Sequence, residues 1–153
     1  MRMTEILPPD LVIPDLRGST KTEVLREFAQ HFASHDPQLD PEQIVQVLVE
    51  REQGGTTAIG DGIAIPHGRL PKLDRIVAAF GRHVQGVDFE SIDGKPTHLF
   101  FVLLLPEDSV GIHLRALARV SRLLKDATVR QRLLTSRNAA ELYQVIQEED
   151  EKL

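Results

Sequence analysis

One histidine of this chain stands in a setting that favours chemistry. Residues 60–68 read GDGIAIPHG, so that a short apolar strand leads into Pro66 and then into His67. Because proline cannot donate a ladder hydrogen bond, we expect the strand to end there and the imidazole of His67 to be reachable at the end of a sheet. Gly68 would let the backbone turn sharply and a ligand approach closely. The competing interpretation is a histidine that only packs at a strand end, with one ring nitrogen bonded to the backbone.

Two further side chains could act on an anion held near such a histidine. His113 follows Gly111 at the start of a predicted helix, where unpaired N–H groups and the helix dipole favour a phosphate or another anion. A solvated first-turn histidine is the alternative. Arg51 lies at the C-terminal end of another predicted helix, where a cation is favourable for the dipole alone. A polar loop flanked by glycines joins that helix to His67 and contains Thr56, Thr57 and Asp61.

Composition and spacing exclude several other kinds of site. The chain has no cysteine, so disulfides, thiolate metal ligands and a cysteine nucleophile are absent. His31 and His35 are four residues apart but lack the glutamate of a His-Glu-x-x-His zinc motif. Neither a glycine-rich phosphate loop nor a Gly-x-Ser-x-Gly elbow occurs. Eighteen basic residues against 23 acidic ones give a net charge of −5, which disfavours nucleic-acid binding.

The hydrophobic pattern predicts one α/β domain over residues 1–153, a length typical of a single domain. Capping residues and helical spacing predict helices over Lys21–Ser34, from Pro41 to the residue before Gly54, over Leu114–Lys125 and after Asn138. Strands are expected at Ile63–Ile65, Arg75–His83 and Leu99–Leu105. The last of these is apolar enough to be a central strand buried on both faces. The charged tail from about Glu148 to Lys152 is expected to fray.

No segment predicts insertion into a membrane or export. The longest uninterrupted apolar run, Leu99–Leu105, is far shorter than the roughly 20 residues that cross a bilayer. The first ten residues lack the apolar region of a signal peptide. We therefore expect a cytoplasmic protein.

The segment at residues 60–68 resembles the phosphorylation-site signature of the fructose/mannitol type (type 2) of enzyme IIA of the bacterial phosphotransferase system. The similarity extends over most of the chain, to Arg51-Glu52, Phe89–Leu105, His113–Ala118 and Glu141-Leu142-Tyr143. With no membrane domain and no cysteine-bearing enzyme IIB domain attached, the chain most resembles the stand-alone nitrogen-regulatory enzyme IIA.

The resemblance implies a central mixed β-sheet flanked by helices on both faces. It also implies that His67 accepts a phosphoryl group, that Arg51 binds phosphate and that His113 supports the reaction. Asp61, Thr56 and Gly68 are given supporting roles. No cofactor and no metal are implied; the donor would be a histidine phosphocarrier of the HPr or NPr type, and the acceptor a regulated target protein or an enzyme IIB. One departure is Ile112, because many relatives of this type carry a polar residue immediately before the second histidine.

Three alternatives stay open at this point. A sugar-specific enzyme IIA would pass its phosphoryl group to a separate enzyme IIB, and the difference lies in the partner rather than in the site. From another class, a metal-dependent hydrolase could use His67, His113 and Asp61 as ligands. A pure interaction module whose His67 is never phosphorylated is the third.

Overall fold

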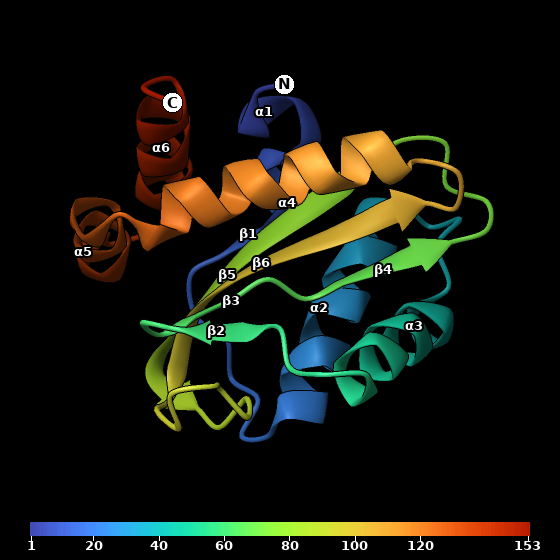
Figure 1. The fold of residues 1–153 in the computed structure, drawn as a ribbon, viewed down its shortest axis with the longest axis horizontal. Helices are drawn as coiled ribbons and strands as arrows, with labels where there is room; N and C mark the ends of the chain where they lie inside the picture. Colours follow the sequence, from blue (N-terminus) through green and yellow to red (C-terminus); the bar gives the residue numbers. More distant parts are fainter.

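The computed structural model describes all 153 residues and shows a mixed six-stranded β-sheet with helices on both faces (Figure 1). The strands are β1 (Val12–Ile13), β2 (Ala58–Gly60), β3 (Ile63–Ala64), β4 (His67–Leu70), β5 (Val77–Val87) and β6 (Thr97–Pro106). The α-helices are α1 (Met3–Ile6), α2 (Lys21–His35), α3 (Pro41–Gln53), α4 (Val110–Lys125), α5 (Ala127–Thr135) and α6 (Ala139–Asp150), and Pro9–Leu11 forms a 3₁₀ turn.

Strand β6 is the centre of the sheet, as its apolar sequence predicts. The strand order is β1-β5-β6-β3-β2, and β4 pairs with β6 as well. Strand β5 runs antiparallel to β6, whereas β3 and β4 run parallel to it on the other side. Every residue from Leu99 to Leu105 is buried, because helices cover both faces of the strand.

Strands β3 and β4 are two pieces of one line of pairing along β6. The register is unbroken across the gap, since Ala64 lies opposite Phe100 and His67 lies opposite Leu103. Pro66 lacks an N–H group, but its carbonyl still accepts a 2.9 Å hydrogen bond from the N–H of Leu103. The expectation that the sheet ends at Pro66 was therefore wrong: the proline interrupts the ladder, and His67 begins the next strand.

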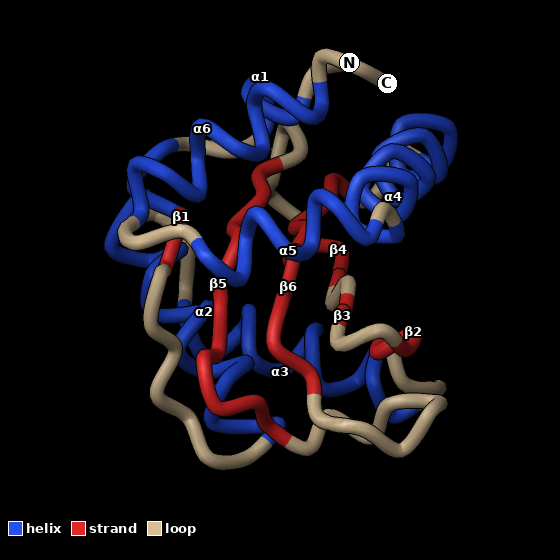
Figure 2. The backbone as a smooth tube through the Cα atoms, turned by 90° about the vertical axis from the view of Figure 1, so that its left-hand side faces the viewer, coloured by secondary structure: helices blue, strands red, loops and turns tan.

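Three of the four predicted helix starts are confirmed by their caps, whereas the helix predicted over Leu114–Lys125 begins earlier, at Val110, without a side-chain cap. Side-chain oxygens of Thr20, Asp40 and Asn138 accept backbone hydrogen bonds at the first turns of α2, α3 and α6. Helices α2 and α3 pack together, with α2 against β5 and α3 against β4, while α4 runs across the other side of the sheet (Figure 1 and Figure 2). None of the helices is both long and apolar enough to cross a bilayer.

The charged C-terminal segment does not fray as expected. Helix α6 continues to Asp150, whose side chain is only 1% exposed. Its carboxylate accepts hydrogen bonds from the backbone N–H of Met3 (2.8 Å) and from Nε of Arg119 (2.6 Å). A second pair joins Glu149 to Arg132 at 2.8 Å. These partners stabilise the helix end, and the nearest of them lies 17 residues away in the chain.

Candidate active site

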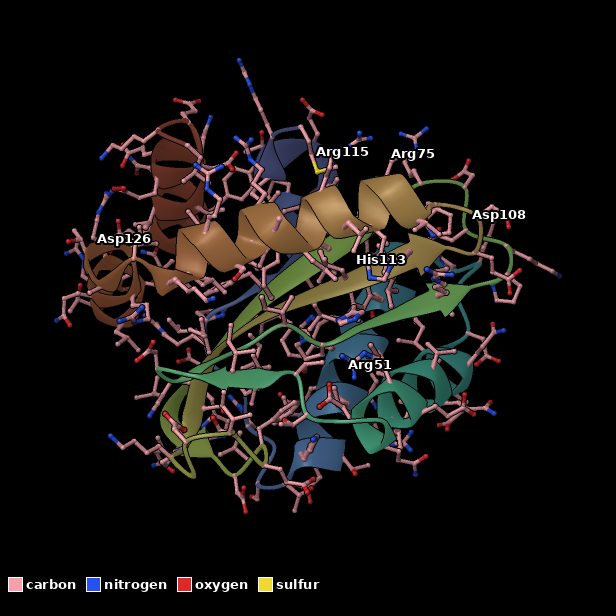
Figure 3. All side chains as sticks on the ribbon, in the orientation of Figure 1. Arg51, Arg75, Asp108, His113, Arg115 and Asp126 are labelled. Carbon is pink, nitrogen blue, oxygen red and sulfur yellow. The ribbon has the colours of Figure 1, made fainter.

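The three residues singled out for phosphoryl chemistry meet in one cleft of about 400 Å³. His67 comes from β4, Arg51 from the last turn of α3 and His113 from the first turn of α4. Figure 3 shows Arg51 and His113 on opposite sides of β4. The cleft is completed by Val47, Glu50, Gly68, Arg69 and Leu105.

The hydrogen bonds of His67 show which of its ring nitrogens carries a free lone pair. Nδ1 lies 2.8 Å from the carbonyl oxygen of Ile65. A carbonyl can only accept, so Nδ1 carries the proton of the neutral ring and Nε2 carries the lone pair. Arg51 Nε donates to that lone pair at 3.2 Å. Nε2 is therefore unprotonated and already faces a guanidinium group.

The surroundings of His67 keep its ring neutral. Burial lowers the pKa of His67 below that of a free imidazole, and the nearby Arg51 and His113 lower it further, although the hydrogen bond to Ile65 opposes them. A neutral imidazole is the form that has a lone pair for attack on phosphorus.

Arg51 is held in place by the loop that follows its own helix. Its Nη1 donates to the carbonyl oxygen of Gly55 at 2.8 Å. The loop is in turn fixed by the buried carboxylate of Glu52, which accepts hydrogen bonds from the backbone N–H (3.0 Å) and the hydroxyl group of Thr57. Lys21 of α2 pairs with Glu52 at 2.9 Å. These contacts hold the guanidinium group of Arg51 in place beside His67.

His113 faces His67 across the cleft. The two ring centroids are 5.3 Å apart, with the ring planes inclined at 63°. His113 is the fourth residue of α4, and its side chain lines the cleft while the three residues before it do not. The sequence predicted that the start of this helix would face an anion, and the group that it places in the cleft is the imidazole of His113. Ile112, the departure from the family pattern, is 42% exposed.

Arg69 is a cleft residue that sequence reasoning missed. It lies two residues after His67 in β4, and side chains two apart in a strand point to the same side. Its Nη2 is 3.3 Å from Nδ1 of His113, and its Nη1 donates to the carbonyl oxygen of Glu107 at 3.3 Å. Had the residues after Pro66 been assigned to a strand, this spacing would have indicated Arg69.

Gly68 lies in the cleft for a different reason from the one expected. It is part of β4 and forms no turn; an added Cβ would lie 2.9 Å from Cγ2 of Val47 on α3. The missing side chain lets α3, which carries Arg51, approach β4, which carries His67.

Asp61 and Thr56 are not brought into the cleft. Asp61 lies in the turn between β2 and β3 at a φ of 57°, where its backbone N–H donates to Asp93 at 3.3 Å. The Thr56 hydroxyl donates to the carbonyl oxygen of Phe89 at 2.9 Å. No group of three or more histidine or acidic side chains stands close enough together to hold a metal ion. The ligand set of the hydrolase alternative is thus not assembled.

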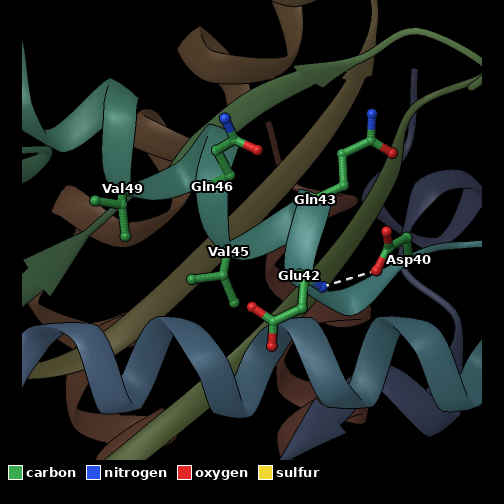
Figure 4. Close-up of a pocket in the computed structure, with 6 residues that line it drawn as sticks. All are labelled: Asp40, Glu42, Gln43, Val45, Gln46 and Val49. Carbon is green, nitrogen blue, oxygen red and sulfur yellow. Dashed lines mark hydrogen bonds between the residues drawn. The ribbon is translucent and has the colours of Figure 1, made fainter.

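A larger hollow elsewhere on the surface has no comparable chemistry. It measures about 620 Å³ and lies along α3 (Figure 4). Its lining has two carboxylates, two amides and two valines, from Asp40, Glu42, Gln43, Gln46, Val45 and Val49. It offers no cation to an anion, and one of its carboxylates already caps the helix.

Comparison with known proteins identifies the family. The family described as "Phosphoenolpyruvate-dependent sugar phosphotransferase system, EIIA 2" matches residues 5–149, and the chain belongs to it. This agrees with the fold and with the histidine-centred cleft.

Individual relatives refine that result. The chain is 42% identical over 146 residues to a "Nitrogen regulatory protein" of Bradyrhizobium diazoefficiens, covering 95% of both chains. It is 32% identical over 150 residues to the "PTS system fructose-specific EIIABC component" of Bacillus subtilis, covering 98% of this chain and 24% of that protein. Among solved structures, the nitrogen regulatory protein IIA-Ntr of Neisseria meningitidis superposes with a TM-score of 0.87 at 31% identity, covering 94% of this chain and 98% of that one.

Proposed function

We propose that this chain is a cytoplasmic histidine phosphocarrier that accepts a phosphoryl group on Nε2 of His67 from a phosphocarrier of the HPr or NPr type. The observation that carries the proposal is the hydrogen bond from Nδ1 of His67 to the Ile65 carbonyl. It fixes one tautomer and leaves the nitrogen that faces Arg51 as the nucleophile.

In the transfer step, the Nε2 lone pair attacks the phosphorus atom carried by the donor's histidine. A P–N bond forms at His67 as the donor's P–N bond breaks, and the bonding electron pair returns to the donor's ring nitrogen. His67 keeps its Nδ1 proton, so its ring becomes positively charged while the phosphoryl oxygens are negative. The Ile65 carbonyl stabilises that charged ring.

Charge stabilisation comes from groups already in the cleft. Phosphoryl transfer depends mostly on positioning and on neutralising the equatorial oxygens. Arg51 donates to Nε2 in the free protein, so the incoming phosphoryl group takes the place of Nε2 as the acceptor of that N–H group. His113 lies opposite and donates to another oxygen.

Exposed apolar side chains at the start of α4, next to His113 in the chain, form a candidate docking surface on one side of the cleft. Val110, Ile112 and Leu114 of α4 are 58%, 42% and 62% exposed, and they flank His113. Apolar groups around a reactive histidine suit the weak, transient interfaces of a phosphoryl relay. We assign the chain to the nitrogen-regulatory branch, in which its phosphorylation state sets its binding to target proteins, because its 42% identical relative carries that name.

Sugar transport is the second candidate function. It is favoured by the similarity to the fructose-specific component of Bacillus subtilis, a protein of which this chain matches 24%. In that case the phosphoryl group on His67 passes to a separate enzyme IIB.

Intact mass measurement tests the proposal. The protein is incubated with phosphoenolpyruvate, enzyme I and an HPr-type carrier, then kept at neutral to alkaline pH. We expect the mass of one phosphoryl group, acid-labile and alkali-stable, and its loss in His67→Ala. Equal labelling of His67→Ala would refute the assignment. Transfer onward to an enzyme IIB would favour the transport role.

A further inference from the structure

The contact between Arg69 and His113 fixes the proton of a second imidazole. A guanidinium group has donors only, so Nδ1 of His113, at 3.3 Å from Nη2 of Arg69, must be the acceptor. The proton of the neutral ring then lies on Nε2. Arg69 is itself anchored, because its other terminal nitrogen donates to the Glu107 carbonyl.

The ring of His113 is surrounded by groups that oppose a positive charge on it. Burial lowers the pKa of His113, and the charges of Arg69 and Arg51 lower it further. The side chains facing it are Arg69 and His67 from β4 and Arg51 from α3, while Glu50 is the acidic residue of the cleft lining. We therefore treat the ring as neutral near pH 7.

Nε2 of His113 is buried and has no hydrogen-bond partner among the protein atoms. Because a buried donor without an acceptor is costly, an acceptor brought to this N–H group would be bound favourably. The ring stands 5.3 Å, centroid to centroid, from the ring of His67. A phosphoryl group attached to His67 would bring oxygen acceptors into the space that the two rings share.

We propose that Arg69 is a positioning residue that keeps the proton of His113 on Nε2, ready to be donated in a hydrogen bond to the phosphoryl group on His67. The inference rests on the proposed function for its purpose, but the tautomer itself is a property of the unphosphorylated protein. It also gives His113 a support that does not depend on a polar residue at position 112.

The tautomer is measured by ¹⁵N NMR of the histidine rings in the complete, unphosphorylated chain, with the His113 signals assigned from a His113→Gln variant. In the wild type we expect the Nε2-protonated pattern at pH 7.5. Arg69→Met removes the donor at similar length, and it should give a mixture of tautomers and an upward shift of the His113 titration midpoint. Arg69→Lys, which retains a cationic donor, should restore part of the wild-type behaviour.

Arg75→Met is the matched control. Arg75 lies in the connection after β4, and its exposed guanidinium is 4.0 Å from Asp74, outside the cleft lining. We expect wild-type His113 signals in this variant. A wild-type His113 that is protonated on Nδ1 would overturn the proposal. So would an Arg69→Met protein with unchanged tautomer and midpoint.

Transfer kinetics test whether Arg69 acts through His113. We expect Arg69→Met to slow phosphoryl uptake about tenfold, by analogy with the loss of activity when the group that orients a metal-ligating histidine is removed. Added to His113→Ala, the same substitution should slow uptake by less than twofold. A full tenfold effect in that background would show direct action of Arg69 and overturn the proposal. If His67 takes up no phosphoryl group, the proposed function fails, while the NMR result still decides the tautomer.

Discussion

Replacing Gly68 with alanine should impair phosphoryl transfer without altering any reactive group. An added Cβ would lie 2.9 Å from Cγ2 and 3.3 Å from Cβ of Val47, closer than the 3.4 Å at which ordinary contact begins. Rotation of the Val47 side chain would still leave its Cβ within 3.3 Å, so we expect α3 and β4 to move apart, by at most about 0.5 Å. Val47 and Arg51 are one helical turn apart on α3, so the movement carries the guanidinium away from His67.

The size of the effect follows from that displacement. The Arg51 Nε to His67 Nε2 distance of 3.2 Å would lengthen beyond hydrogen-bonding range. A misplacement of 1 Å costs on the order of 100-fold in rate, so half of that should cost about tenfold. Overpacking at such a contact typically destabilises a fold by about 1 to 3 kcal/mol, which leaves a domain of this size folded.

The assay is a time course of phosphoryl uptake from an HPr-type donor, read by intact mass, with thermal unfolding measured in parallel. Gly111→Ala is the matched control, because an added Cβ there meets nothing within 4 Å. Val47→Ala removes the clashing methyl groups, so it should restore most of the rate when combined with Gly68→Ala. A folded Gly68→Ala protein that transfers at the wild-type rate would refute this reasoning, as would a double variant no faster than Gly68→Ala.

Three further predictions concern the reactive groups. Arg51→Lys should slow uptake roughly 10- to 100-fold in the same time course, since one charge-assisted hydrogen bond is worth about 1.5 to 3 kcal/mol. Arg115→Lys is the control. If both variants take up the phosphoryl group at the same rate, Arg51 does not belong to the site. His113→Ala should still be phosphorylated on His67, but the activation free energy of transfer should rise by about 2 to 4 kcal/mol. Peptide mapping that places phosphate on His113 in the wild type would contradict this division of roles. Because burial lowers the pKa of His67, its ¹⁵N titration midpoint should fall below the usual histidine value of about 6.5, so the His67 ring is neutral at pH 6.5 and above. A midpoint at or above about 6.5 would contradict this prediction.

Local sequence signals predicted the starts of α2, α3 and α6 and the central strand β6, but not β4, which carries His67 and Arg69. Caps at Thr20, Asp40 and Asn138 located three helix starts, and the apolar run Leu99–Leu105 located the central strand. Both signals are encoded by residues close together in the chain, where propensity and periodicity act.

Contacts between distant residues could not be predicted in this way. Arg69 meets His113 across 44 residues, and Asp150 meets Met3 across 147. Pro66 indicated a strand end, yet pairing with β6 continues on both sides of it because the register is set by the whole sheet. The charged tail was misjudged because the burial of Asp150 depends on those remote partners.

The most direct test of the account is to locate the phosphorus atom on the ring of His67. Protein labelled with ¹⁵N is phosphorylated by enzyme I and an HPr-type carrier, then studied by ¹⁵N and ³¹P NMR at alkaline pH. Because the Ile65 carbonyl holds the Nδ1 proton, we predict a P–N bond at Nε2 with the Nδ1 proton retained. A phosphoryl group on Nδ1 of His67, or on any other residue, would contradict the account.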